Sequence, residues 1–523
     1  MNRKRTLGRK LLASAGAGAL GLLGVVGLAS TAMAADPGNI DPDETGSLTI
    51  HKHLGLPTDL ANNGTQLADD ALDPDDNPPA EKVEFKLQQV GVINSGGTCV
   101  ALNPAVAGDW DAIQAATSPL VTGTTEGDYC VAADKGTQET NASGVVTFTP
   151  LDLGFYYVTE GADNGGNNIV KKTAPFFVTV PFPSYAGTSP TAERVWTYDV
   201  HVYPKNQAAE VPTKTISDTP SKYAVGATVV WTIDAVVPTL ADDDSFTQGS
   251  VYDQLDSRLT FKSSKVYVDG TEVTDASVVT KPAENATGTL TWSFVDPAGL
   301  ALLKANQGKT ITVELTTEVN ATIGDGQIEN APGTPGNGYG SSFNDVPTPG
   351  DETPVTLWGQ LVVNKQDNST PAKPLKDAEF KVFEKSAATC PTEAPATGAV
   401  ATGTSNADGV VQWDASDPAS SPLGLWIGNW DKKTDVPVSP SKDYCVYETK
   451  VPAGYTGTTG AQVATITPGS TTPVAITVTN AQKDVPDLPE TGANGTRLMI
   501  IGGSALVLIA GGLFLARRRQ EQQ

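Results

Sequence analysis

Three sets of residues that could each form a covalent cross-link recur along this chain of 523 residues. In each, a lysine lies in an opening strand-like stretch, an acid follows, and an asparagine ends a late strand-like stretch. The sets are Lys52, Glu160 and Asn206; Lys214, Asp253 and Asn330; and Lys365, Glu448 and Asn480. Because residues two apart share one face of a strand, Leu48 and Ile50 place Lys52 on an apolar face. Lysine is rarely buried without a partner, so we expect each set to meet in a core.

The chemistry open to such a set is a bond between the lysine amine and the asparagine side chain, with loss of ammonia. Burial favours the neutral forms of an amine and of a carboxylic acid. A protonated acid can then polarise the asparagine carbonyl through a hydrogen bond. A fold that holds the groups in contact lets a slow reaction proceed without an enzyme. The plainer alternative is a buried ion pair beside a hydrogen-bonded asparagine.

The sets do not fit this pattern equally well. In the second set Lys222 competes with Lys214 as the reacting lysine. The residues that flank the first set match the pattern poorly. We therefore treat the Lys52–Asn206 bond as the least secure expectation of the three.

Strands must position these residues. The chain has 52 glycines and 37 prolines and few long helical patterns, which is typical of an all-β chain built of several sandwiches. Three segments, each with one set, are expected at residues 35–206, 207–354 and 355–484. A stretch rich in glycine and proline, residues 331–354, closes the second segment.

The N-terminus carries an export signal. Residues 1–34 combine a basic start, an apolar run and the small residues Ala32-Met33-Ala34. This order predicts a secretory signal peptide that is cleaved after Ala34.

The C-terminus carries three features in sequence. Residues 485–492 hold a short linker and the motif Leu488, Pro489, Glu490, Thr491 and Gly492. Residues 493–523 follow, with the apolar run Leu498–Ala516, long enough to span a bilayer as a helix, and an arginine-rich tail. This order resembles the sorting signal of Gram-positive surface proteins that are processed by sortase. The resemblance implies cleavage after Thr491, transfer of Thr491 to an amine, and anchoring to the cell wall.

Charge and cysteine content agree with an exported product. The net charge of −24 argues against a nucleic acid as partner. An even number of cysteines in an exported chain indicates disulfides. Proximity along the chain favours Cys99–Cys130 and Cys390–Cys445, although the sequence alone leaves the pairing open.

We expect no cofactor, no metal site and no turnover enzyme. The acidic runs 73–76 and 242–244 lack the spacing of a calcium loop and are better read as solvated loops. His51 and His53 could begin a metal site, but nothing else completes it. The acids Glu160, Asp253 and Glu448 would assist only the self-modifying reaction of their own sets.

The strand at residues 195–206 carries the most specific motif. Its fixed positions, W-x-x-x-V-x-V-Y-P-K, are met by Trp196, Val200, Val202, Tyr203, Pro204 and Lys205. It resembles the pilin motif of shaft subunits in sortase-assembled pili. The resemblance implies that Lys205 attacks the acyl-sortase intermediate and receives Thr491 of the next subunit. Alternation sends Val200, Val202 and Asn206 inward, and Tyr203 and Lys205 outward.

Further stretches resemble domains of the same proteins. Residues 444–455, YCVYETKVPAGY, resemble the E-box of CnaB-type pilin domains, in which a glutamate assists the isopeptide bond. The second segment is similar to the isopeptide-forming D2 domain of the CnaA type. The chain as a whole resembles SpaA-type major pilins, such as fimbrial shaft subunits of Actinomyces. This implies three tandem Ig-like β-sandwiches: an N-terminal pilin domain, a D2-like middle domain and a CnaB-like C-terminal domain.

The resemblance also implies a set of partners. These are identical subunits in a head-to-tail covalent polymer, pilin-specific and housekeeping sortases, a minor or tip pilin, peptidoglycan and a host-surface receptor. The alternative is a monomeric wall-anchored adhesin that binds a host ligand. Lys205 discriminates between the two, because a monomeric adhesin needs no acceptor lysine.

Overall fold

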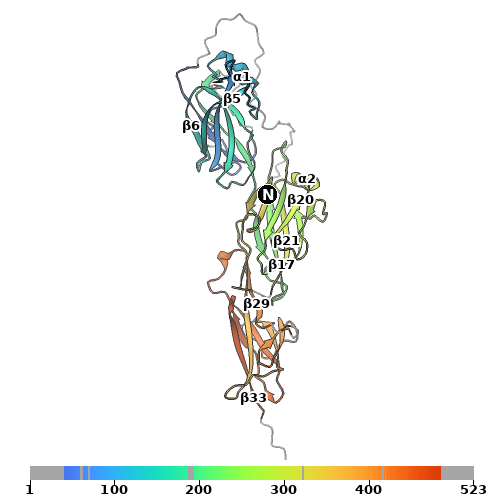
Figure 1. The fold of residues 1–523 in the computed structure, drawn as a ribbon. Coiled ribbons are helices and arrows are strands. Elements are labelled where there is room, and N and C mark those ends of the chain that lie inside the picture. The colour runs from blue at the N-terminus through green and yellow to red at the C-terminus, as the bar shows by residue number, and fades with distance from the viewer. Residues whose placement is uncertain are drawn as a thin grey trace, which may run out of the picture. The chain divides into compact units, whose positions relative to one another are not determined.

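The structure is a computed structural model that describes residues 40–58, 60, 63–68, 71–185, 194–320, 323–414, 417 and 420–483. The expected signal peptide, the LPETG motif and the apolar run Leu498–Ala516 lie outside these residues. Within them the chain is built mostly of strands in several sheets (Figure 1), which confirms the expected fold class. None of the helices in this part of the chain is long and apolar enough to cross a membrane.

The described residues divide into two compact units. The first holds the residues up to Gly359, together with Gly424–Lys442 and Thr467–Thr471. The second holds Gln360–Leu423, Asp443–Ile466 and the residues from Thr472 on. The first unit therefore contains the first two expected segments and three stretches from the third, residues 355–359, 424–442 and 467–471. The boundaries of the three expected domains stay a prediction.

The first segment places its core between two sheets. One has the order β12-β1-β6, and the other has the order β4-β3-β7-β9, with β5 also on β3. Two smaller sheets, β2-β13-β8 and β10-β11, complete it. The elements are β1 (Gly46–His51), β2 (His53–Leu54), β3 (Val83–Ile93), β4 (Cys99–Ala101), η1 (Ala107–Asp109), α1 (Trp110–Ala115), β5 (Tyr129–Glu139), β6 (Val145–Leu151), β7 (Gly154–Asp163), β8 (Ile169–Lys171), β9 (Phe176–Val180), β10 (Phe182–Tyr185), β11 (Arg194–Thr197), β12 (Asp199–Val202) and β13 (Lys205–Ala208).

The middle segment is a sandwich of two five-stranded sheets, β14-β15-β21-β17-β18 and β19-β20-β16-β23-β24. The glycine- and proline-rich stretch contributes strands to the second of them, because β23 pairs with both β16 and β24. The elements are β14 (Thr213–Ile216), β15 (Thr228–Val236), β16 (Gly249–Gln254), β17 (Leu259–Val268), β18 (Thr271–Glu272), β19 (Val279–Thr280), β20 (Thr289–Phe294), α2 (Ala298–Ala305), β21 (Thr310–Val319), β22 (Gln327–Glu329), β23 (Gly340–Phe343) and β24 (Val346–Pro349).

The third segment also has two sheets. One has the order β22-β25-β33-β31, with β29 on β25, and the other has the order β28-β27-β26-β30-β32. The elements are β25 (Val355–Asp367), β26 (Glu379–Glu384), β27 (Ala401–Ser405), β28 (Val411–Gln412), β29 (Leu423–Trp430), η2 (Lys433–Asp435), β30 (Lys442–Lys450), β31 (Tyr455–Thr456), β32 (Gln462–Ile466) and β33 (Gly469–Gln482).

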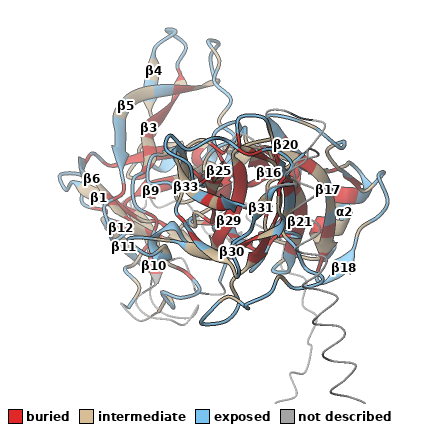
Figure 2. Ribbon diagram, turned by 90° about the horizontal axis from the view of Figure 1, so that it is seen from below, coloured by how far each residue is buried: buried red, intermediate tan, exposed pale blue. Residues whose placement is uncertain are grey.

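Alternation along the strands builds these cores. In β21, Ile311, Val313 and Leu315 are fully buried, whereas the residues between them are partly exposed. The period of two puts one face of the strand against the other sheet and leaves the opposite face to solvent. Figure 2 shows the same pattern, with buried residues along strands such as β3 and β16 and exposed residues in the loops. A lysine in phase with such a buried row must enter the core.

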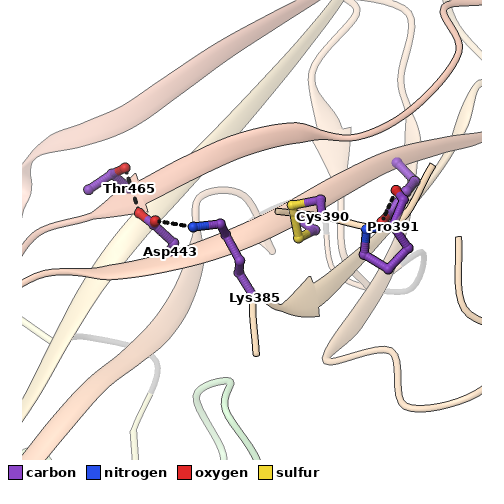
Figure 3. Close-up of a disulfide and its surroundings, with 7 residues drawn as sticks. Lys385, Cys390, Pro391, Asp443 and Thr465 are labelled. Carbon is purple, nitrogen blue, oxygen red and sulfur yellow. Dashed lines mark hydrogen bonds and ion pairs between the residues drawn. A yellow bond between two sulfur atoms is a disulfide. The ribbon is translucent and has the colours of Figure 1, made fainter. Parts of the chain in front are cut away.

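The four cysteines form two disulfides, Cys99–Cys130 and Cys390–Cys445. The second lies beside a small polar cluster (Figure 3), in which the Asp443 carboxylate accepts hydrogen bonds from Lys385 and Thr465. The two disulfides close stretches of 31 and 55 residues.

Replacing Cys390 and Cys445 together by serine should lower the free energy of unfolding of the second unit by about 4 kcal/mol, because the unfolded chain is no longer cross-linked. Urea unfolding of the mature chain measures this change. The Cys99→Ser/Cys130→Ser pair is the matched control, since it should leave the transition of the second unit in place. An unchanged midpoint for the Cys390/Cys445 variant would contradict the expectation.

Candidate functional site

In each of the three sets, the lysine and the acid reach the core from different sheets. Lys52 follows β1, whereas Glu160 lies in β7. Lys214 lies in β14 and Asp253 in β16; Lys365 lies in β25 and Glu448 in β30. The side chains of all three lysines are fully buried. The structure therefore brings each predicted lysine and acid together inside its sandwich.

The first set is closely assembled. Strands β1 and β12 pair in parallel, and so do β2 and β13, which brings Lys52 near Asn206. The Nζ atom of Lys52 lies 3.0 Å from Oε2 of Glu160 and 2.5 Å from Oδ1 of Asn206. The Nδ2 atom of Asn206 donates to Oε1 of Glu160. The amine, the amide and the carboxyl group are thus in mutual contact.

A fourth residue, Thr173, belongs to the first set and was missed by the sequence reasoning. Its main-chain N–H donates to Oδ1 of Asn206 at 2.6 Å, and its hydroxyl oxygen lies 2.9 Å from the same atom. The Nζ atom of Lys52 also donates to this hydroxyl, at 2.9 Å. Thr173 lies in the loop between β8 and β9, where no periodicity marks it.

The middle set meets on one carboxylate oxygen. The Nζ atom of Lys214 lies 2.5 Å from Oδ2 of Asp253, and Nδ2 of Asn330 donates to the same oxygen at 3.1 Å. Lys214 also lies over the rings of Trp231 and Tyr339. The competing Lys222 is exposed and lies outside the set.

The third set is looser at the lysine. The Nδ2 atom of Asn480 donates to Oε1 of Glu448 at 2.8 Å, whereas Nζ of Lys365 lies 3.7 Å from that oxygen. Lys365 donates instead to the main-chain oxygen of Val478, at 3.1 Å. Val478 and Asn480 share one face of β33, so this contact holds the amine near the amide.

Burial makes the three lysines better nucleophiles. It lowers the pKa of Lys52 to about 8, although the neighbouring Glu160 carboxylate opposes this shift. Burial likewise lowers the pKa values of Lys214 and Lys365 below the ordinary value of a lysine. Each amine is therefore more often neutral near physiological pH than an exposed lysine would be.

Asp431 and Lys433, which follow β29, form a hydrogen bond and an ion pair with the strands that carry the middle set. The main-chain N–H of Ile216, two residues after Lys214, donates to Oδ1 of Asp431 at 2.8 Å. Lys433 forms an ion pair of 2.8 Å with Glu329, the neighbour of Asn330. Both the lysine strand and the asparagine strand are thus held from outside the sandwich.

The strand with the W-x-x-x-V-x-V-Y-P-K motif buries Val200, Val202 and Asn206, as alternation predicts. Lys205 is only partly exposed, because residues that follow β2 lie against it: its Nζ atom is 3.3 Å from Oγ1 of Thr58. Burial lowers the pKa of Lys205. The sequence predicts that this lysine points outward, whereas in the structure it is half-buried beside the loop that follows β2.

The ring of Tyr203, expected to point outward, is also partly covered. It stacks on His51 with a centroid distance of 4.4 Å, and its hydroxyl accepts a hydrogen bond from the N–H of Leu67. The chain between β2 and β3 therefore lies over the outer side of the motif at both Tyr203 and Lys205.

Comparisons with known proteins match these features. Residues 43–207 match the family model of the N-terminal D1 domain of Gram-positive pilin subunits, and residues 480–522 match the LPXTG cell wall anchor motif. The chain is 31% identical to fimbrial subunit type 2 of Actinomyces naeslundii, over 99% of this chain and 98% of that protein.

Solved structures show the same fold. The full-length major pilin SpaD from Corynebacterium diphtheriae matches with a TM-score of 0.57 and 23% identity, over 86% of this chain and 99% of that one. The major pilin SpaA from the same organism matches with a TM-score of 0.52 and 19% identity, over 84% of this chain and 100% of that one.

Together, the fold and the anchor motif define a surface protein that is anchored to the cell wall of a Gram-positive bacterium. More narrowly, the chain belongs to the family of Gram-positive major pilins, with the Actinomyces fimbrial subunits. It is a major structural subunit of a sortase-assembled pilus, as the sequence predicts. The family is one of structural proteins.

Proposed function

We propose that Lys205 of one subunit is joined to Thr491 of the next, and that the three buried sets form isopeptide bonds within each subunit. The observation that carries the first part is the half-buried Lys205 amine, whose pKa is lowered by burial and which ends a complete pilin motif. A neutral amine can attack the acyl group that sortase forms at Thr491 and release the enzyme. Each such step adds one subunit to the polymer.

Within a subunit, the lysine nitrogen attacks the side-chain carbonyl carbon of the asparagine. A C–N bond forms, the C–N bond to the amide nitrogen breaks, and ammonia leaves with a proton taken from the lysine. The acid of each set transfers that proton. The partners of the reacting groups support this reading, because Asp253 touches both Lys214 and Asn330 through a single oxygen.

The three cross-links would stiffen the shaft. Each joins a residue near the start of its segment to one near its end, so tension along the chain passes through the bond and the strands between need not separate. A housekeeping sortase would then transfer the finished polymer to peptidoglycan, with a minor pilin at its tip and a host-surface receptor as its target. A monomeric adhesin is the alternative, and the acceptor position of Lys205 argues against it.

The intact mass of the recombinant mature chain, residues 35–491, tests the internal cross-links. We expect a deficit of three ammonia molecules, and peptide mapping should place one on each lysine–asparagine pair. A mass equal to that of the unmodified chain with its two disulfides would overturn the proposal.

The rate of the first-domain reaction should depend on pH through Lys52. Because the pKa of Lys52 is about 8, the neutral fraction of its amine, and with it the rate, should rise about tenfold per pH unit below that value and then level off. Ammonia loss from the Lys52–Asn206 pair, followed after refolding from about pH 6 to about pH 9, measures this. A rate that is flat over this range would contradict the assignment of Lys52 as the nucleophile.

A further inference from the structure

We propose that Thr173 is a catalytic residue of the first domain, where its main-chain N–H and its hydroxyl hold the carbonyl oxygen of Asn206 during attack by Lys52. The proposal rests on the proposed bond between these two residues. It assigns to the first set an activating group that the other two sets do not share.

The geometry of Thr173 is that of a two-donor site. The N–H lies 2.6 Å and the hydroxyl oxygen 2.9 Å from one acceptor, Oδ1 of Asn206. The hydroxyl also lies 2.9 Å from the main-chain oxygen of Lys205, and its single proton turns to Asn206 when negative charge develops on Oδ1. The loop is held in place because β8 pairs with β13, with Lys171 opposite Gln207. Two donors aimed at one carbonyl oxygen stabilise the negative charge that develops there when a nucleophile adds to the carbonyl carbon.

The N–H of Thr173 also decides which way the Asn206 amide points. A main-chain N–H can only donate, so the atom that it meets at 2.6 Å must be the carbonyl oxygen. The amide nitrogen of Asn206 therefore faces Glu160 and donates to it. Glu160 cannot polarise the carbonyl from this position, and Thr173 takes that part of the chemistry.

Glu160 is then placed to move the proton. One of its oxygens, Oε2, lies 3.0 Å from Nζ of Lys52, and the other, Oε1, meets Nδ2 of Asn206. As the C–N bond forms, the carboxylate takes a proton from the attacking nitrogen and returns it to the leaving nitrogen. The amide nitrogen departs as ammonia, the oxygen held by Thr173 becomes a carbonyl again, and no oxidant or further reactant is needed.

The other two sets provide the contrast. Within the described residues, Oδ1 of Asn330 and Oδ1 of Asn480 are buried and have no hydrogen-bond partner. One carboxyl oxygen of each acid, Oδ1 of Asp253 and Oε2 of Glu448, is likewise buried and has no hydrogen-bond partner among the described residues. In these sets too the acid accepts from the amide nitrogen of the asparagine, and no donor in this part of the chain meets the carbonyl oxygen, so Thr173 has no counterpart there.

The test compares two variants of the mature chain, Thr173→Val and Thr173→Ser. Valine keeps the branched shape and removes the hydroxyl, whereas serine keeps the hydroxyl and loses a methyl group. Each chain is refolded, and ammonia loss at Lys52–Asn206 is followed by peptide mass spectrometry. We expect valine to slow this bond by about tenfold to a hundredfold, since one of two oxyanion donors is lost, and serine to react at a rate near that of the natural chain. The Lys365–Asn480 bond in the same sample is the internal control.

The opposite order of rates would overturn the proposal. If Thr173 served packing alone, valine would be tolerated and serine would be the slower variant. A Thr173→Val chain that reacts as fast as the natural chain would equally refute it. A failure of the proposed function itself would look different, because the bond would then be missing from the natural chain as well. Should valine prevent folding of the first domain, the serine variant still tests the proposal, since it keeps both donors and a rate far below that of the natural chain would refute it.

Discussion

Replacing Lys205 by alanine should abolish the covalent polymer and leave only single subunits attached to the wall. Lys205 supplies the one amine that the pilin motif offers to the acyl group at Thr491, and its partly buried position lowers its pKa. Without it, the acyl-enzyme has no acceptor on the next subunit. An immunoblot of cell-wall extracts boiled in SDS should change from a ladder of high mass to a single band.

The matched control for this experiment is Lys172→Ala. Lys172 is an exposed lysine of the same domain whose amine donates to the main-chain oxygen of Gly161. Its removal should leave the ladder intact, because it lies outside the motif. A ladder that persists in the Lys205→Ala strain would rule out Lys205 as the acceptor and would favour the monomeric adhesin or another lysine.

Replacing Lys214 by alanine should destabilise the middle domain more than any single change at the surface. The bond to Asn330 would close a stretch of 116 positions, which is worth about 5 kcal/mol if it acts on the unfolded chain as a disulfide does. The variant also removes the N–H that the bonded Lys214 nitrogen offers to the fully buried Asp253, and leaving a buried polar group without its partner costs about 1–3 kcal/mol more. We expect a large fall in the denaturant midpoint of this domain and rapid cleavage by trypsin.

The double variant Lys214→Met/Asp253→Leu separates these two contributions. It also lacks the cross-link, but it leaves no unpaired charge in the core, so it should lie between the natural chain and Lys214→Ala in stability. Intact mass confirms for each variant that one ammonia fewer has been lost. Equal stability of Lys214→Ala and the natural chain would mean that Lys214 forms neither the bond nor a stabilising ion pair.

The lysines of the three sets could be predicted from the sequence because their burial follows from a local rule. Leu361 and Val363 alternate with partly exposed positions, so Lys365 had to continue the buried row. The acids Glu160, Asp253 and Glu448 could be proposed on similar grounds. Each acid meets the lysine of its own set across two sheets. The threefold repeat of the pattern suggested this contact, but periodicity within a strand does not predict which residues meet between sheets.

Thr173 and the surroundings of Lys205 could not be predicted in this way. Thr173 meets Asn206 because β8 pairs with β13, and its loop carries no alternation. Lys205 is covered by Thr58, which lies 147 positions away in an irregular stretch. The hydrogen bond from Ile216 to Asp431 joins residues 215 positions apart. Contacts of this kind depend on how loops pack over strands. The alternation of buried and exposed residues along a strand does not predict them.

The most direct test of the central claim is the identification of the peptide that joins two subunits in purified pili. Digestion of the polymer and mass spectrometry should yield a branched peptide in which the carbonyl carbon of Thr491 is bonded to Nζ of Lys205. Finding Thr491 joined to another lysine of the subunit, or to peptidoglycan alone, would contradict the account.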